Sequence, residues 1–288
     1  MTLTGPIVLA VLFGALLHAS WNALIKSSLD KTLDTALIQA AGVLLALPLL
    51  AATGLPPTRA WPYIAASALV HVGYFTALTG AYKYGDLGLT YPVMRGTAPL
   101  LVALGSQALL GENLSRLAWL GVAGTCTGVL LLGLSPASLH TSSGHRSKAL
   151  RFALANAAII ALYTGIDGLG VRASGNAAAY VAALCLFDGL PYLLLVLWRR
   201  RRQHLAVLAH AARRWKIGLL GTLALTGSYG IALWAMTRAP VASVAALRET
   251  SVLFAALIGT LWLREPFGRQ RALGTLAVLA GVMALRFG

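Results

Sequence analysis

The sequence predicts an all-α integral membrane protein with ten transmembrane helices, arranged as two inverted five-helix repeats around a central cavity. The first reason is composition: of 288 residues, 58% are hydrophobic and only 11% are charged, whereas about a quarter of the residues of a soluble domain are charged. The second reason is that apolar stretches of membrane-spanning length follow one another along the whole chain. The third is an internal repeat that divides these stretches into two equal sets.

The apolar stretches are each about 20 residues long, which is enough for a helix to cross a bilayer. We identify ten in chain order: 5–26, 34–52, 60–83, 88–110, 116–134, 150–172, 177–198, 213–238, 241–263 and 270–286. The first lacks the basic start and clean apolar core of a secretory signal, so we expect it in the mature protein. No connection between the spans is long enough to hold a soluble domain.

The internal repeat is visible from the fourth span onward, where five residues recur in the same order 153 positions later. The pairs are Arg95 and Arg248, Glu112 and Glu265, Arg116 and Arg269, Gly121 and Gly274, and Gly128 and Gly281. We therefore expect a first repeat (1–134), a Ser/Gly/His-rich linker (135–149) and a second repeat (150–288). An odd number of spans inverts the second copy, an arrangement typical of secondary transporters with a midplane substrate site.

The net charge is +15, but the positions of the basic residues argue against a nucleic-acid partner. Connections that follow odd-numbered spans hold 16 of the 23 Lys and Arg, and the opposite side of the membrane holds 5. Such an excess marks the cytoplasmic side. We therefore expect a multi-pass protein of the plasma (inner) membrane with both termini outside. The arginine run at 199–202 would then lie against anionic lipid headgroups.

Polar side chains within the spans form the candidate substrate site, because polar groups at membrane depth face the bundle interior or a water-filled cavity. In seven spans these residues are three or four positions apart, and so share one helix face. The candidates are His18, Trp21, Asn22, His71, Tyr74, Tyr91, Arg95, Tyr163, Asp167, Tyr229, Arg248 and Glu249. Asp167 and Asp188 could both lie near the membrane surface, and Asp188, which shares this spacing with Tyr192, is left out of the site.

The two arginines at depth, Arg95 and Arg248, are the most informative candidates because a guanidinium keeps its charge. Each could tie two helices together by pairing with an acidic residue or with backbone carbonyls. Alternatively, at least one faces the cavity and binds a substrate carboxylate or phosphate through two parallel hydrogen bonds. The histidines could be structural or could carry protons. The aromatic residues could stack on a substrate or simply pack.

The fifth and tenth spans have few polar groups but carry small residues at helical spacing, which allow helix backbones to approach closely. We expect these spans to pack as a structural pair, or to join two protomers, so that the protein is a monomer or a homodimer. Cys126 and Cys185 lack metal or redox spacing. The sequence also lacks a phosphate-binding Gly-Lys-Ser/Thr loop and the zinc and serine hydrolase motifs, so we expect neither an enzyme nor a cofactor.

Three local motifs resemble the drug/metabolite transporter superfamily, in its EamA-type branch. Two are at corresponding places in the two repeats: the Gly111-Glu112 turn after the fourth span and the Arg264-Glu265-Pro266 turn after the ninth. The third is residues 21–26 at the end of the first span. The resemblance covers essentially the whole chain. It implies a basket-like cavity lined by spans 1, 3, 4, 6, 8 and 9, with spans 5 and 10 behind. Many ten-span members keep both termini in the cytoplasm, opposite to the orientation expected here.

From the repeat and this resemblance we expect a secondary transporter that does not use ATP and works by alternating access. Its substrates would be small metabolites such as amino acids, including aromatic ones, and export is the expected direction. A carboxylate would meet Arg95 or Arg248, and an ammonium group would meet Glu249 or Asp167. The alternatives are an exporter of organic cations or drugs, for which the acids matter instead, and a membrane enzyme or sensor subunit.

Overall fold

The computed structural model describes residues 3–287 apart from 27, 29, 85–86, 134–142, 255–256 and 258–267. In these ranges every regular element is a helix, so the all-α prediction is confirmed for the described residues. Short 3-10 helices, η1 (Thr58–Ala60) and η3 (Arg201–Gln203), precede α3 and α8. The α-helices are α1 (Gly5–Lys26), α2 (Lys31–Thr53), α3 (Trp61–Tyr84), α4 (Leu87–Leu110), α5 (Arg116–Gly133), α6 (Ser143–Ser174), α7 (Ala177–Arg199), α8 (His204–Met236), α9 (Val241–Arg248) and α11 (Arg269–Phe287).

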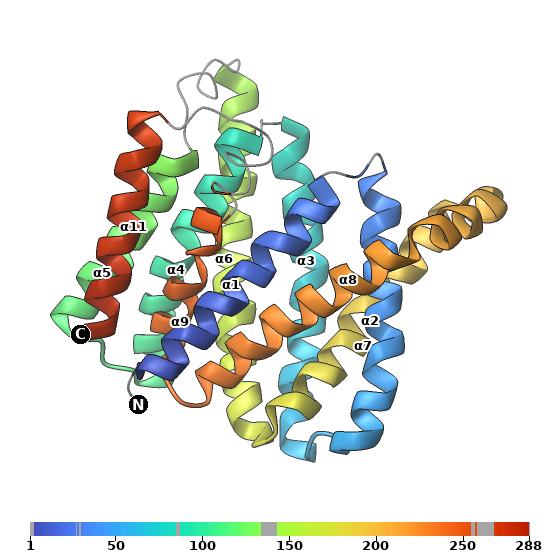
Figure 1. Cartoon of the computed structure of the whole chain (residues 1–288), viewed down its shortest axis with the longest axis horizontal. Helices are drawn as coiled ribbons and strands as arrows, with labels where there is room; N and C mark the ends of the chain where they lie inside the picture. The colour runs from blue at the N-terminus through green and yellow to red at the C-terminus, as the bar shows by residue number, and fades with distance from the viewer. Residues whose placement is uncertain are drawn as a thin grey trace.

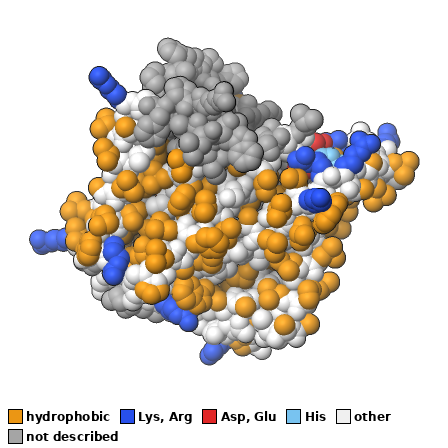
Figure 2. Space-filling model, in the orientation of Figure 1, with side chains coloured by type: hydrophobic (Ala, Val, Ile, Leu, Met, Phe, Trp, Pro, Cys, Tyr) orange, Lys and Arg blue, Asp and Glu red, His pale blue; other side chains and the backbone are white. Residues whose placement is uncertain are grey.

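The outer surface has the character of a lipid-facing surface. Five described helices, α1, α2, α6, α7 and α8, are long and apolar enough to cross a membrane, and α5 and α11 are apolar but shorter. Leu9, Leu44 and Leu69 expose 69%, 68% and 74% of their surface, which is costly in water but not in hydrocarbon. Figure 2 shows hydrophobic side chains across the visible face, with Lys and Arg mainly at its periphery.

Helices of one repeat pack mainly against helices of the other. In Figure 1, α1 runs along α8, α3 along α6, and α2 along α7. The first helices of the two repeats are α1 and α6, the second are α2 and α7, and the third are α3 and α8. In both directions the first helix of one repeat thus packs on the third helix of the other, and the two second helices pack on each other. These three pairings are therefore symmetric under exchange, as expected for two inverted copies. Both chain termini lie at the same end of the bundle, as an even number of spans demands (Figure 1).

The pairing of α5 with α11 shows the same symmetry in atomic detail. A Cβ on Gly121 would lie 2.8 Å from the carbonyl oxygen of Gly281, and a Cβ on Gly128 would lie 2.7 Å from that of Gly274. Gly121 is the repeat counterpart of Gly274, and Gly128 that of Gly281, so the two contacts exchange under the repeat. Only glycine permits such close backbone contact. The glycine face of each helix is thus covered by the other helix.

Local sequence explains where several helices begin and end. Asp30 caps α2 by accepting a hydrogen bond from the Leu33 amide at 3.0 Å, and Asn176 caps α7 by accepting one from Ala179 at 3.1 Å. Such side-chain caps satisfy amides that have no partner within the helix. The chain after α2 turns at Gly54, whose φ of 78° lies in the left-handed region that favours glycine.

Two helices extend beyond the predicted spans. α6 begins at Ser143, inside the stretch expected as a linker, and α8 begins at His204 rather than at 213. With 33 residues, α8 is roughly 50 Å long and exceeds the bilayer core of about 30 Å. Its first part projects with the end of α7 as an arm, which is the orange and ochre hairpin in Figure 1. The additional part of α6 is polar, whereas that of α8 is largely apolar and is followed by the basic residues Arg213, Arg214 and Lys216.

The sequence predicts one continuous helix for the ninth span. The structure instead shows a break within it. α9 ends at Arg248, the next two residues form a turn, and residues 251–254 are helical again. The amides of Glu249 and Thr250 bond to carbonyls three residues earlier rather than four, which tightens the backbone at the break. The equivalent α4 runs through Arg95 without a break. The two repeats therefore differ in backbone at the position of their paired arginines.

The arm is fastened to α2 by a buried carboxylate. Asp34 has no exposed surface and accepts hydrogen bonds from Arg214 Nε at 2.9 and 3.0 Å and from Arg214 Nη2 at 2.6 Å. His210 Nε2 lies 2.7 Å from the same carboxylate. Nearer the tip, Arg200 and Asp30 form a more exposed ion pair at 3.0 Å. These contacts hold two basic segments of the arm against the first repeat.

Removing the Asp34 carboxylate is expected to loosen the arm. In Asp34→Ala, Arg214 and His210 lose their shared partner, and breaking such a pair typically costs several kcal/mol. We expect trypsin to cleave the arginine run at 199–202 several-fold faster, because proteolysis follows local opening. Limited proteolysis with mass spectrometry measures the rate. Arg59→Ala, which removes an exposed loop arginine away from the arm, is the control, and equal rates in both variants would contradict the anchoring role.

Candidate functional site

The centre of the site is a buried ion pair between the repeats. Arg95 Nε on α4 lies 3.0 Å from Glu249 Oε2, directly after the end of α9. The two residues are 9% and 4% exposed. A buried pair of this kind stays charged only because each partner compensates the other. The structure therefore brings these two candidates together and assigns Arg95 a partner from the opposite repeat.

The second arginine has a different environment. The Arg248 guanidinium lies over the Tyr229 ring, 5.3 Å from the ring centroid, in a cation–π contact. Within the described part of the chain it makes no ion pair. The Tyr229 hydroxyl in turn donates a hydrogen bond to Asp167 Oδ2, and Tyr180 donates to Oδ1 at 3.0 Å. A chain of contacts thus leads from Arg248 to the fully buried Asp167.

Aromatic rings fill the region between α3 and α6. The His71 and Tyr163 rings lie 4.4 Å apart with planes tilted by 32°, and Tyr74 meets Tyr163 edge-on at 6.0 Å. Asn156 donates a hydrogen bond to the Tyr74 carbonyl at 2.9 Å, which ties α6 to α3. Tyr74, Tyr163 and His71 therefore lie in one cluster. The side chain of Tyr91 lies outside the described residues.

The first span contributes a local group rather than a bridge between helices. Trp21 Nε1 donates a hydrogen bond to His18 Nδ1 at 3.3 Å, and the two rings meet at right angles. Asn22 donates to the His18 carbonyl at 2.8 Å. An indole nitrogen can only donate, so His18 Nδ1 must be unprotonated. His18 also lies within electrostatic range of Arg95 and Arg248.

Asp188 and Asn156 belong to this region but were not among the predicted site residues. Asp188 Oδ2 lies 3.6 Å from His71 Nδ1. The expectation that Asp188 lies near the membrane surface is wrong: it is in the middle of the 23-residue α7. An acid in the middle of an apolar span was the available signal. For Asn156, the signal was its position seven residues before Tyr163, on the same helix face.

A clamp closes the helix ends at the face opposite the arm. Glu112 Oε1 accepts a hydrogen bond from Arg172 Nη2 at 2.5 Å, and its Oε2 accepts one from the Val241 amide at 2.8 Å, at the start of α9. Arg172 also donates to the carbonyls of Met236 and Ala239 at 2.8 and 3.2 Å. The repeat had drawn attention to Glu112, but not to Arg172. Its counterpart Glu265 lies outside the described residues.

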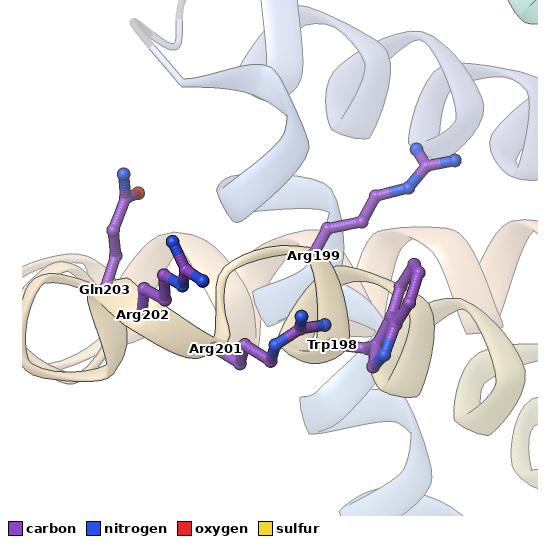
Figure 3. Close-up of a pocket in the computed structure, with 5 residues that line it drawn as sticks. All are labelled: Trp198, Arg199, Arg201, Arg202 and Gln203. Atoms are coloured by element: carbon purple, nitrogen blue, oxygen red, sulfur yellow. The ribbon is translucent and has the colours of Figure 1, made fainter.

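Two surface cavities lie away from this centre. One, of about 820 Å³, borders the clamp and is lined in part by Arg172, Trp234 and Arg238. The other, of about 380 Å³, lies at the tip of the arm. Figure 3 shows its lining of Trp198, Arg199, Arg201, Arg202 and Gln203. Among the described residues no group of three His, Cys, Asp or Glu could hold a metal ion.

Comparison with curated proteins gave no match. Among solved structures, a crystal structure described only as that of a protein has a TM-score of 0.76 and 17% sequence identity with this chain. The similarity covers 99% of this chain and 98% of the other. At this identity the likeness shows the fold alone.

A family model described as the EamA-like transporter family matches residues 5–134 and again residues 147–287. Each match covers five of the ten predicted spans. The resemblance that rested on the Gly-Glu and Arg-Glu-Pro turns is therefore confirmed, and with it the prediction of an all-α membrane protein built from two inverted repeats. The chain belongs to the EamA-like transporter family and is a multi-pass membrane transporter of the drug/metabolite superfamily.

Proposed function

We propose that this transporter exports small zwitterionic metabolites, amino acids including aromatic ones, by alternating access between its two repeats. The observation that carries the proposal is the unequal state of the two arginines. The charge of Arg95 is matched by Glu249 at 3.0 Å, whereas Arg248 contacts a tyrosine ring. Of the two guanidinium groups, Arg248 is thus the one whose charge is left to a substrate carboxylate.

The neighbours of Arg248 suit the rest of such a substrate. A guanidinium can bind a carboxylate through two parallel hydrogen bonds. Asp167, linked to Arg248 through Tyr229, supplies a buried negative charge for an ammonium group. Tyr74 and Tyr163 offer ring faces and edges to an apolar or aromatic side chain. The break after α9 places these groups where backbone geometry differs between the repeats, as in other transporters with interrupted helices.

An exporter of organic cations or drugs is the second candidate. The tyrosines around Asp167 favour it, because tyrosine rings and a buried carboxylate together attract cations. In that case neutralising Asp167 would abolish transport and replacing Arg248 would not. Competition by lipophilic cations, but not by amino acids, would select this alternative.

The distribution of basic residues supports a plasma-membrane location with both termini outside. Arg200, Arg201, Arg202 and Arg214 all belong to the arm, at the end of the molecule expected in the cytoplasm. A cysteine introduced at position 59, in the opposite loop, should react with an impermeant maleimide added to intact cells. Labelling only after the membrane is opened would reverse the orientation without affecting the substrate proposal.

Replacing Arg248 is expected to abolish transport without unfolding the protein. Hydrogen bonds to charged groups contribute about 1.5–3 kcal/mol, so Arg248→Ala should weaken binding by roughly ten- to a hundredfold. Arg248→Lys should recover little, because an ammonium lacks the two-pronged geometry. Uptake of labelled phenylalanine into proteoliposomes measures the effect. Arg59→Ala, which removes an exposed loop arginine, is the control, and normal flux in Arg248→Ala would exclude Arg248 from the mechanism.

A further inference from the structure

His71 and Asp188 form a titratable pair that the proposed substrate site does not use. His71 lies on α3 in the first repeat, and Asp188 on α7 in the second. Their nearest atoms, His71 Nδ1 and Asp188 Oδ2, are 3.6 Å apart, and both side chains are 16% exposed. Asp188 Oδ1 is buried and has no hydrogen-bond partner within the described part of the chain. An unbalanced carboxylate at this depth is costly unless it meets a positive charge.

The contacts of His71 fix which of its nitrogens holds the proton. Nδ1 lies 2.8 Å from the carbonyl oxygen of Ser67, one turn earlier on α3. A carbonyl can only accept a hydrogen bond, whereas the Ser67 hydroxyl, 3.3 Å from Nδ1, can donate or accept, so the shorter contact to the carbonyl assigns the proton to Nδ1. In the neutral ring Nε2 is then the basic nitrogen. A proton that binds Nε2 produces an imidazolium whose Nδ1–H side faces the Asp188 carboxylate.

The other histidine of the centre has the opposite arrangement. His18 Nδ1 accepts a hydrogen bond from Trp21, and the neighbouring charges are those of Arg95 and Arg248. A second positive charge there would be repelled, and protonation of Nδ1 would break the bond to Trp21. His18 is therefore held neutral, whereas His71 has a carboxylate in place to receive a positive charge.

The remaining groups around His71 favour a proton rather than a metal or a second cation. The described titratable groups near the pair are Tyr74 on α3, Tyr163 and Asp167 on α6, and Tyr180 and Cys185 on α7. Each oxygen of Asp167 accepts a hydrogen bond from a tyrosine hydroxyl, that of Tyr180 or Tyr229, whereas Asp188 has no such donor among the described residues. No lysine or arginine side chain makes an ion pair with Asp188 among the described residues. Imidazole is the side chain that exchanges a proton near neutral pH.

We propose that His71 and Asp188 are the proton-binding pair that couples transport by this protein to a proton gradient. The proton adds to Nε2 of His71, and no other bond forms or breaks. Because the pair joins the two repeats, protonation adds an attraction between elements that alternating access must separate. The proton thereby changes the relative stability of the two access states. This inference rests on the proposed transport function, but not on the identity of the substrate.

The His71 ring also provides a physical link to the substrate region. It stacks on Tyr163, which lies one helical turn before Asp167. Asp167 holds the hydroxyl of Tyr229, whose ring lies under Arg248. A change in charge at His71 therefore acts across one stacked ring on the residues proposed to bind substrate.

The test compares two kinds of transport by the reconstituted protein. In the first experiment, proteoliposomes loaded with phenylalanine exchange it for labelled phenylalanine at equal pH on both sides, which measures counterflow. In the second, a pH gradient is imposed across the membrane, and accumulation of phenylalanine is measured together with proton flux, which is reported by pyranine. Asp188→Asn should retain counterflow and lose both gradient-driven accumulation and substrate-dependent proton flux, and His71→Gln should lose the same proton flux. Leu190→Ala, an exposed side chain two residues away on α7, should retain all three activities. Gradient-driven accumulation in Asp188→Asn would overturn the proposal.

The outcome separates this inference from the proposed substrate. Counterflow without any proton flux in the unaltered protein would reject the proton pair and leave the substrate proposal standing. Absence of counterflow would reject phenylalanine as substrate, and loss of counterflow in Asp188→Asn would indicate a structural role. After either of these two results, ¹⁵N NMR of histidine-labelled protein tests the proposal, because it shows which ring nitrogen of each histidine is protonated. The variants His71→Gln and His18→Gln assign the signals. We expect His71 in the Nδ1–H form and His18 in the Nε2–H form; an Nε2–H form of neutral His71 would overturn the proposal.

Discussion

Gly281→Ala is expected to destabilise the protein strongly, although it adds a single methyl group. A Cβ at this position would lie 2.5 Å from Thr125 Oγ1, 2.6 Å from the Thr125 amide nitrogen and 2.7 Å from the Gly121 carbonyl oxygen. Two of these three atoms belong to the backbone of α5 and cannot move alone. The whole α5–α11 contact must therefore open. Overpacking of this kind costs about 1–3 kcal/mol and occasionally more, and Gly281→Leu should yield no folded protein.

Gly105→Ala is the matched control for this prediction. Gly105 lies within α4, and a Cβ there would meet nothing within 4 Å. Since alanine favours a helix over glycine by up to about 1 kcal/mol, Gly105→Ala should be neutral or stabilising. Thermal unfolding in detergent, monitored by size-exclusion chromatography, measures both variants. Equal melting temperatures would mean that α5 and α11 are not in the close contact described here.

The same glycines show why much of the fold could be predicted from the sequence. The repeat spacing identified Gly121, Gly128, Gly274 and Gly281 as equivalent positions, and small residues at helical spacing indicate close helix packing in membranes. Most of the ten spans were located because a helix in lipid must be apolar along about 20 residues. These signals depend on composition and period alone, so a single sequence carries them.

The parts that could not be predicted depend on backbone geometry or on contacts between distant residues. The break after Arg248 is invisible to hydropathy, because the residues on both sides of it are apolar. The start of α8 is largely apolar, but it was not predicted because the basic residues Arg213, Arg214 and Lys216 separate it from the longer apolar stretch. Spacing rules find neighbours on one helix, but Asp188 meets His71 across the repeat boundary. The assignment of candidate residues to substrate binding remains a prediction.

The polar centre illustrates this limit most clearly. The sequence left open whether Arg95 and Arg248 pair with acids or face a substrate, and it treated the two as equivalent by the repeat. The structure pairs Arg95 with Glu249 and places Arg248 over Tyr229. Identical residues at equivalent positions thus acquire different surroundings, because the acid that follows Arg248 in the second repeat is replaced by Gly96 in the first. A duplicated chain can divide structural and binding roles in this way.

Glu249→Ala is expected to have a large effect on both stability and transport. It leaves the Arg95 guanidinium buried without its carboxylate, and removing one partner of a buried pair costs about 3–5 kcal/mol. Arg59→Ala is the control, because it removes an exposed loop side chain and surface substitutions of this kind are usually within about 0.5 kcal/mol of neutral. Thermal unfolding of the two variants in detergent gives the difference. Comparable losses would mean that the Arg95–Glu249 pair is not buried in the working protein.

The double variant Arg95→Met/Glu249→Met separates the structural role of the pair from its role in transport. Replacing both charges with apolar groups removes the uncompensated guanidinium, and such replacements are often neutral or stabilising. We therefore expect the double variant to recover most of the stability lost in Glu249→Ala. Transport should not recover, because a neutral centre no longer offers charge to a zwitterion that passes between the repeats. Recovery of phenylalanine flux together with stability would show that the pair only holds α4 against the end of α9.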